Sequence, residues 1–296
     1  MSDWRILGDW GSSRLRLWRL HAGEITDQRE GPGIVGLCRP PADVLLETIA
    51  PWCEHGAPER LTLCGMAGAR EGLGDTPYAP CPLDATQWKR LSRRLSLKGM
   101  RVQIAAGCAH GTNEVMRGEE TQLFGAMTIW PELRTGKQVV VLPGTHSKWV
   151  WLEDGTIRRF RTMLTGELFA LLQTSSLLKA REPSPAAGDT AGFADGIAEA
   201  LDSPGIIGKL FAARARQLRE NRSASWARSY LSGLLIAGEI AEMRAAASLP
   251  GRLTLVGDAT LCTLYARAFA ALDVTSAILD GQTSALAGLK LFDSDD

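Results

Sequence analysis

Residues 143–148, Pro-Gly-Thr-His-Ser-Lys, form the stretch of this chain best suited to bind phosphate. Gly144 leaves the backbone open to an anion, and Thr145, Ser147 and Lys148 add two hydroxyl groups and an ammonium group. Together with backbone N–H groups, these side chains can donate hydrogen bonds to phosphoryl oxygens. A tight hairpin with a polar tip is the alternative, since the stretch matches no Walker pattern.

A second copy of this unit lies near the N-terminus. Residues 6–18 align with the later stretch when Gly11 is placed on Gly144, and hydroxyl residues then coincide at Ser12 and Thr145. Each copy predicts a strand, a glycine-containing turn, a second strand and a short third strand. The repeat therefore predicts two similar lobes that face each other across a cleft.

The two copies differ at Asp9, which aligns with Leu142. To hold Mg²⁺ between a nucleotide and its acceptor, a protein needs a carboxylate beside only one of its two phosphate loops. Asp9 is therefore the candidate metal-binding residue.

Two adjacent glutamates, Glu119 and Glu120, begin a predicted helix directly after Arg117 and Gly118. The helix dipole alone favours acidic residues in a first turn, and this explains one glutamate comfortably. Gly118 would also let a ligand approach closely, and Arg117 could orient an acid or an anionic substrate. The pair is thus a candidate for general acid–base chemistry.

Two further strands end in glycine. The strand predicted at 61–64 leads into the glycine-rich loop 65–70, at the end of a strand where open α/β sheets bind ligands. The strand predicted at 253–258 breaks at Gly257 and Asp258, where a base or ribose could lie against bare backbone near a helix N-terminus. A plain connecting loop is the alternative for residues 65–70.

Hydrophobic periodicity and caps predict the elements that position these residues. Helices are expected at 41–52, 84–97, from about 119, 165–178, within 194–219, and at 224–247, 259–271 and 282–291, with further strands at 101–106, 139–142, 157–162 and 274–279. Asp84 and Thr165 are the expected N-caps of their helices. Glu239 falls in an apolar part of its helix, where it is either buried with a partner or on a solvent-facing edge.

These elements predict an α/β protein of two lobes, each with a mixed sheet. Residues 131–136 are the expected link between an N-terminal lobe, 1–135, and a C-terminal lobe, 136–281, and the helix within 282–296 is expected to join the first lobe. A loop or linker is predicted at 182–192, which is rich in Pro, Ala, Gly and Ser.

Composition limits the partners. Lys plus Arg and Asp plus Glu each number 33, so nucleic acid and anionic membranes are not expected. No apolar run approaches the ~20 residues of a membrane span, and no signal peptide is evident, so a cytoplasmic protein is expected. Six scattered cysteines and four histidines show no metal spacing, which favours reduced thiols. Apolar helix surface and nine tryptophans leave room for a homodimer.

Taken in order, the motifs resemble the 2-dehydro-3-deoxygalactonokinase family. They are Asp-Trp-Gly-Ser-Ser (9–13), Gly-Met-Ala-Gly (65–68), Val-Met-Arg-Gly-Glu-Glu-Thr-Gln-Leu (115–123), Leu-Pro-Gly-Thr-His-Ser-Lys-Trp-Val (142–150), Phe-Arg-Thr-Met-Leu-Thr-Gly-Glu-Leu (160–168) and Leu-Ser-Gly-Leu-Leu-Ile (231–236). The resemblance implies a two-lobed, actin-like ATPase fold, which is ribonuclease H-like, with an interlobe cleft. It also implies transfer of the ATP γ-phosphate to the 6-hydroxyl of 2-dehydro-3-deoxy-D-galactonate.

The resemblance assigns roles to the motif residues. It implies a first phosphate motif at Asp9, Gly11, Ser12 and Ser13, a second at Gly144, Thr145, His146, Ser147 and Lys148, and an adenosine motif at Gly257 and Asp258. Asp9 would organise Mg²⁺ through water. His146 could stabilise charge on the transferred phosphoryl group or simply bond within its loop.

The expected base is Glu119 or Glu120, with Asp9 as the alternative. Many sugar kinases of this fold use an aspartate, but the second phosphate loop offers none. Exopolyphosphatases of the same fold take a catalytic glutamate from a helix start similar to 118–120.

The substrate carries a carboxylate, which an arginine should bind bidentately. The candidate substrate-binding residues are Arg16, Gly68, Arg70, Arg117, Arg161 and Glu167. The sequence does not select among the arginines or fix the stereoisomer. Three alternative functions stay open: a polyphosphate or guanosine pentaphosphate hydrolase, a hexokinase-type kinase of another sugar, and a nucleotide-sensing module without turnover.

Overall fold

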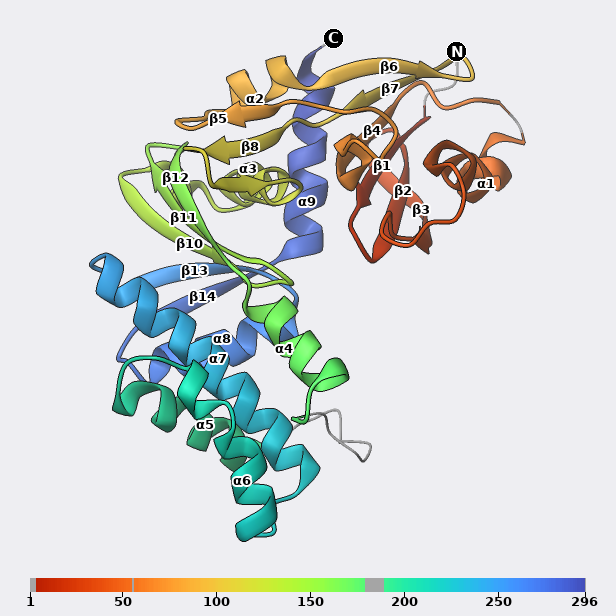
Figure 1. The fold of residues 1–296 in the computed structure, drawn as a ribbon. Coiled ribbons are helices and arrows are strands. Elements are labelled where there is room, and N and C mark those ends of the chain that lie inside the picture. Colours follow the sequence, from red (N-terminus) through yellow and green to blue (C-terminus); the bar gives the residue numbers. More distant parts are fainter. Residues whose placement is uncertain (1–3, 55, 179–188, 296) are drawn as a thin grey trace. The chain divides into compact units, whose positions relative to one another are not determined.

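The computed structural model describes residues 4–54, 56–178 and 189–295 (Figure 1). The chain divides into two compact units. The first comprises Met1–Gln138, Val150–Phe160 and Asp280–Asp296, and the second comprises Val139–Trp149 and Arg161–Leu279.

A six-stranded mixed sheet forms the centre of the first unit, in the order β3-β2-β1-β4-β7-β6. Its strands are β1 (Trp4–Trp10), β2 (Arg14–His21), β3 (Glu24–Pro32), β4 (Leu61–Gly65), β6 (Arg93–Leu97) and β7 (Met100–Ile104). β1 is antiparallel to β2 and parallel to β4, and β4 is parallel to β7. Apolar residues of these strands pack with those of helix α1 (Pro41–Cys53) in one buried core.

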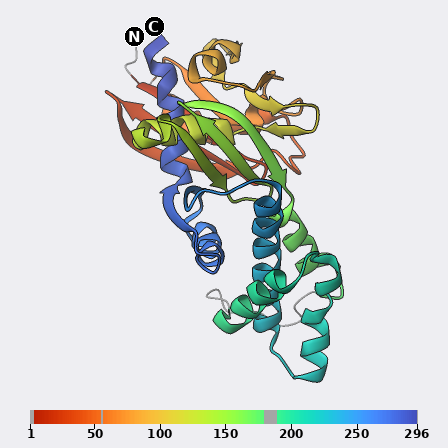
Figure 2. The same ribbon diagram turned by 90° about the vertical axis from the view of Figure 1, so that its left-hand side faces the viewer.

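Three further helices and a small sheet also belong to the first unit. The helices are α2 (Ala85–Leu91), α3 (Glu119–Ile129) and α9 (Gly281–Lys290), and the small sheet consists of β5 (Tyr78–Pro80), β8 (Gly107–His110) and β9 (Glu114–Met116). α9 lies beside α3, as Figures 1 and 2 both show. The C-terminal segment is also tied to β1, since Arg5 Nη2 lies 2.7 Å from Asp293 Oδ2.

A second mixed sheet has the order β12-β11-β10-β13-β14. Its strands are β10 (Lys137–Leu142), β11 (Ser147–Glu153), β12 (Thr156–Met163), β13 (Arg252–Gly257) and β14 (Thr275–Asp280). The order of its first four strands repeats that of β3-β2-β1-β4, and β13 is parallel to β10 as β4 is to β1. The repeat predicted from the two glycine-containing hairpins is therefore confirmed.

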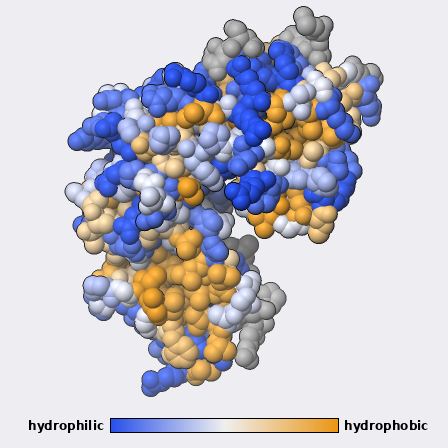
Figure 3. All heavy atoms as spheres, turned by 45° about the horizontal axis from the view of Figure 1, so that its top comes forward, coloured by the Kyte–Doolittle hydropathy of each residue, from blue (hydrophilic) through white to orange (hydrophobic). Residues whose placement is uncertain are grey.

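Helices make up most of the second unit. They are α4 (Thr165–Ser175), α5 (Thr190–Asp202), α6 (Ala212–Arg219), α7 (Ala224–Ala246) and α8 (Ala259–Ala270). One face of α7 is buried and includes Tyr230, Leu234 and Ile240. Figure 3 shows apolar residues gathered on one face of this unit. Large exposed apolar side chains in the unit include Leu164, Leu171, Ile207, Phe211 and Leu218.

The helix predicted at 84–97 is too long. It begins as expected, because the Asp84 carboxylate accepts a hydrogen bond from the Gln87 backbone N–H at 2.8 Å, but it ends at Leu91. Residues 93–97 instead pair with β7 as strand β6. Lys98 and Gly99, both at positive φ, make the two-residue turn that such a hairpin requires.

The predicted N-cap of α4 is also wrong. Leu164 occupies the N-cap position, without a side-chain cap, and Thr165 is the first helical residue. Most of the predicted 182–192 loop lies outside the described residues, and α5 begins at Thr190. In the described ranges of the chain, no helix is both long and apolar enough to cross a membrane.

Candidate active site

Asp9 lies near the carboxyl end of β1, beside the end of β4. The register pairs Asp9 with Cys64 and Trp10 with Gly65, so the two strands end together at the edge where α/β sheets bind ligands. Asp9 Oδ1 is 3.7 Å from Cys64 Sγ, and Asp9 Oδ2 is 3.4 Å from Arg16 Nη2. Burial raises the pKa of Asp9, and the Arg16 charge opposes that rise.

The turn after β1 is held by backbone hydrogen bonds. The Gly11 N–H donates to the Arg14 carbonyl at 2.8 Å, and the Ser12 carbonyl accepts from the Val35 N–H at 3.0 Å. The side chains of Ser12 and Ser13 are exposed and have no hydrogen-bond partner among the residues that the structure describes. This turn therefore leaves two hydroxyl groups exposed.

The two glutamates at the start of α3 have different environments. The Glu120 side chain is fully buried, and its two oxygens accept hydrogen bonds from the Gly118 N–H at 2.9 and 2.8 Å. Glu119 is partly exposed, and its Oε2 accepts from the Arg117 N–H at 3.0 Å. Of the pair, Glu119 therefore has the more exposed side chain.

Electrostatics separates the two glutamates further. Burial, together with the neighbouring Glu119 charge, raises the pKa of Glu120 to about 8, although hydrogen bonding to the Gly118 N–H lowers it. Glu120 is therefore mostly a neutral acid at pH 7. Gly118 has a φ of +110° and lies against the end of β4. A Cβ added to Gly118 would lie 3.3 Å from Gly65 Cα.

Arg117 is fully engaged within the first unit. Its Nη2 donates to the Thr76 carbonyl at 2.8 Å, its Nη1 bonds the Thr76 hydroxyl, and its guanidinium carbon lies 4.2 Å from the centre of the Tyr78 ring. The Thr76 hydroxyl also donates to the Gly68 carbonyl at 3.2 Å. Arg117 thus holds the loop after Gly68 against the β9–α3 junction.

The other three candidate arginines differ in their partners. Arg16 pairs with Asp9, and Arg161 Nη2 donates to Glu242 at 2.9 Å in an exposed ion pair. Arg70 is exposed and makes no hydrogen bond or ion pair with any described residue. Of the four, Arg70 has the guanidinium most available to a carboxylate.

The first turn of α4 packs against the second phosphate loop. A Cβ on Gly166 would lie 2.2 Å from the Gly144 carbonyl oxygen, so only glycine allows this approach. The Glu167 N–H donates to the Thr145 carbonyl at 2.8 Å, and the Glu167 carboxylate lies 2.5 Å from His146 Nε2. Glu167 therefore fixes the loop through both its backbone and its side chain.

Ser147 and Lys148 lie in the interior, although both were predicted to contact ATP. Ser147 Oγ is 2.7 Å from the Tyr265 hydroxyl and 3.2 Å from Glu239 Oε2. Lys148 is 4% exposed, and its Nζ donates to Thr162 Oγ1 at 3.2 Å. The loop positions open to a ligand are thus Gly144, Thr145 and His146.

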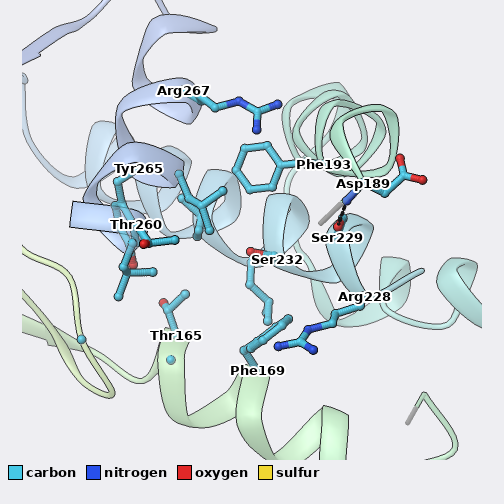
Figure 4. Close-up of a pocket in the computed structure, with 16 residues that line it drawn as sticks. Thr165, Phe169, Asp189, Phe193, Arg228, Ser229, Ser232, Thr260, Tyr265 and Arg267 are labelled. Atoms are coloured by element: carbon cyan, nitrogen blue, oxygen red, sulfur yellow. Dashed lines mark hydrogen bonds between the residues drawn. The ribbon is translucent and has the colours of Figure 1, made fainter. Parts of the chain in front are cut away.

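A pocket of about 280 Å³ lies among the helices of the second unit (Figure 4). It is lined by Gly144, Thr165, Gly166, Phe169, Phe193, Arg228, Ser229, Ser232, Thr260, Leu261, Tyr265 and Arg267, among others. The guanidinium carbon of Arg267 lies 4.7 Å from the centre of the Phe193 ring, and that of Arg228 lies 6.0 Å from the centre of the Phe169 ring. Aromatic and apolar walls that end at a glycine loop suit a flat ring joined to phosphates.

The β13–α8 turn adjoins this pocket. Asp258 is the N-cap of α8, and its Oδ1 accepts from the Leu261 N–H at 3.0 Å. Gly257 packs near the second phosphate loop, since a Cβ on it would lie 3.3 Å from the Pro143 carbonyl oxygen. Asp258 therefore holds the first turn of α8, which lines the pocket.

Sequence reasoning missed Phe169, Phe193, Arg228, Ser232 and Arg267. They come from four different helices and match no short motif. Only Phe169 had a usable signal, because it lies four residues after Thr165 and so on the same face of α4.

In the described part of the chain, no three or more His, Cys, Asp or Glu side chains gather as a metal cage. Mg²⁺ at a nucleotide site does not need one, since it keeps several waters and binds one or two carboxylates together with the phosphates. The buried carboxylate of Asp9 fits that kind of site.

The fold is that of the actin-like ATPases. An activator of 2-hydroxyisocaproyl-CoA dehydratase from Clostridium difficile, solved with ADPNP, aligns with a TM-score of 0.52. The alignment covers 98% of this chain and 94% of that chain, and the two are 13% identical, so the likeness concerns the fold alone.

The chain belongs to the 2-keto-3-deoxy-galactonokinase family, whose model matches residues 9–292. It is 34% identical to the 2-dehydro-3-deoxygalactonokinase of Escherichia coli K12 over 287 residues, which is 95% of this chain and 94% of that protein. A solved structure from Sinorhizobium meliloti, provisionally described as a 2-dehydro-3-deoxygalactonokinase, is 32% identical with a TM-score of 0.86 over 97% of each chain. The family resemblance drawn from the motifs is confirmed.

Proposed function

We propose that the protein transfers the γ-phosphoryl group of ATP to the 6-hydroxyl of 2-dehydro-3-deoxy-D-galactonate, giving the 6-phosphate and ADP. The observation that supports this most directly is the family match over nearly the whole chain. The pocket beside Gly144 and the paired glutamates at the start of α3 supply groups that such a reaction needs.

In this proposal the second unit binds ATP. The adenine ring of ATP lies between the aromatic and apolar walls of the pocket. There Phe169 lies beside Arg228, and Phe193 lies beside Arg267. The phosphates lie against the backbone at Gly144, within reach of Thr145 and His146, which are both exposed. Ser147 supports this loop from the interior and does not touch the nucleotide.

The first unit supplies the acid–base chemistry. Glu119 takes the proton of the 6-hydroxyl as its oxygen attacks the γ-phosphorus, and ADP leaves. Glu120, as a neutral acid, orients the turn through Gly118. Asp9 would hold Mg²⁺, which, when bound, neutralises charge on the phosphate oxygens. Ser12 and Ser13 contact phosphate, and Arg70 binds the substrate carboxylate.

A coupled assay of ADP release tests this function. We expect ADP formation that depends on both ATP and a 2-keto-3-deoxy sugar acid, with little phosphate release when the acid is absent. The acceptor panel should include galactonate-derived and gluconate-derived acids and plain hexoses. Phosphate release without an acceptor would indicate the hydrolase, and turnover of glucose alone would indicate a hexokinase-type enzyme.

A further inference from the structure

Glu239 of α7 is a buried carboxylate directly behind the second phosphate loop. It is 2% exposed, and its Oε1 accepts a hydrogen bond from Trp149 Nε1 at 2.7 Å. Its Oε2 lies 2.7 Å from the Tyr265 hydroxyl and 3.2 Å from Ser147 Oγ. The Thr165 side chain also bonds this carboxylate. Both carboxylate oxygens therefore have partners.

These partners belong to the elements that surround the loop. Ser147 and Trp149 belong to β11, which begins where the loop ends, Thr165 begins α4, and Tyr265 belongs to α8. Thr165 and Tyr265 also line the nucleotide pocket. One carboxylate thus fixes β11, α4 and α8 relative to one another at the place where Gly144, Thr145 and His146 face the ligand.

Stability alone does not explain a carboxylate at this position. A buried acid loses its hydration, and well-packed apolar groups often stabilise a core as much as buried charge does. What an apolar residue could not do is accept hydrogen bonds from three elements at once. The direction of those bonds is what sets the position of the loop.

We propose that Glu239 is a positioning residue that holds the second phosphate loop and the α4 N-terminus in the geometry that binds the phosphates of ATP. The inference rests on the proposed function, because it names a residue that supports the same nucleotide site without touching the nucleotide.

The test compares Glu239→Ala with Glu239→Gln. Alanine leaves Trp149 Nε1 and one of the two hydroxyls without an acceptor, since Ser147 and Tyr265 can bond only each other. The KM for ATP and the Kd for ADP should therefore rise roughly tenfold or more. Glutamine can direct its carbonyl oxygen to Trp149 Nε1 and its amide to the two hydroxyl oxygens, which can turn to accept. We therefore expect glutamine to keep both constants within about threefold of wild type.

Ile240→Ala is the matched control. Ile240 is a fully buried neighbour on α7 outside the pocket lining, so its truncation should lower the melting temperature without changing the KM for ATP. If Glu239→Ala does not fold, Tyr265→Phe tests the positioning role of Glu239 instead. This variant keeps the aromatic ring and removes the one hydroxyl that bonds Glu239. Tyr265→Phe should raise the Kd for ADP severalfold.

Failure of the positioning role and failure of the proposed function would give different results. A wild-type Kd for ADP in Glu239→Ala, or in Tyr265→Phe when the alanine variant does not fold, would overturn the positioning role and leave the kinase assignment intact. Failure of the wild-type protein to bind ATP or ADP at all would overturn the proposed function, and the inference with it.

Discussion

Glu119 and Glu120 are neighbours in sequence but lie in opposite environments. Glu120 is buried and bonded to a backbone N–H group, whereas Glu119 reaches the surface. A general base must contact the proton that it removes, and so accessibility favours Glu119. The sequence alone offered both residues equally, because adjacency along a helix does not reveal which side chain turns inward.

We expect Glu119→Gln to lower kcat by ~10²-fold or more while the Kd for ADP stays near wild type, because the amide cannot accept the proton. Glu120→Gln should keep measurable activity, because its carboxyl group orients the turn and does not take the proton. Initial rates with saturating ATP and sugar acid measure the difference. Equal, near-wild-type rates for both variants would show that neither Glu119 nor Glu120 is the catalytic base.

The pKa of Glu120 makes stability depend on pH. In the native state, the Glu120 carboxyl group keeps its proton up to about pH 8. In the unfolded chain, the same group releases its proton near its ordinary pKa of 4.5. Stability from this group is therefore full below about pH 4.5 and is lost as the pH rises through 8, by at most ~1.4 kcal/mol per pH unit. Urea unfolding from pH 5 to 8 should show a smaller pH dependence in Glu120→Gln than in wild type. Identical slopes would contradict a raised pKa.

Arg70 should determine the affinity for the acidic substrate. Arg70→Lys keeps the charge but loses the bidentate geometry, so we expect the KM for the sugar acid to rise roughly tenfold with little change in the KM for ATP. Arg101→Lys is the control, since Arg101 is exposed and pairs with Glu59 at 3.2 Å. An unchanged KM in Arg70→Lys would move the carboxylate contact to another arginine.

At the scale of elements, the candidate residues of each unit lie at a glycine-containing hairpin and at the helix starts of that same unit. Asp258 illustrates this, since it was predicted as a nucleotide contact and is the N-cap of α8. Its effect on ATP should therefore act through the first turn of that helix, where Thr260 and Leu261 line the pocket.

We expect Asp258→Ala to lower the free energy of unfolding by ~1 kcal/mol and to raise the KM for ATP, whereas Asp258→Asn, which still caps the helix, changes both little. Asp84→Ala removes the equivalent cap of α2 and should lower stability alone. Urea unfolding and ATP titrations measure both effects. A large rise in KM for Asp258→Asn would instead indicate that the charge of Asp258 acts on the nucleotide.

Local pattern predicted many elements because caps and hydrophobic periods are short-range signals. It failed at 93–97, where the strand depends on pairing with β7 and on the Lys98-Gly99 turn. It also failed for Ser147, whose direction is set by Glu239 and Tyr265, far away in sequence. The Phe193 and Arg267 walls of the pocket likewise come together only through helix packing.

At the scale of the whole molecule, one strand–turn–strand design occurs twice, and each copy has different neighbours. The first copy has a carboxylate at Asp9, and the second adjoins a helical pocket at Gly144. The repeat was visible in the sequence because it lies in contiguous stretches. The family followed from motifs spread along the chain, and the whole-chain match confirms it.

The most direct test is ³¹P NMR of the protein incubated with ATP, Mg²⁺ and 2-dehydro-3-deoxy-D-galactonate. We predict a new phosphate monoester on C6 that forms in equal amount with ADP, while inorganic phosphate stays at background. Inorganic phosphate forming in step with ADP, with no sugar phosphate, would contradict phosphoryl transfer to the sugar acid.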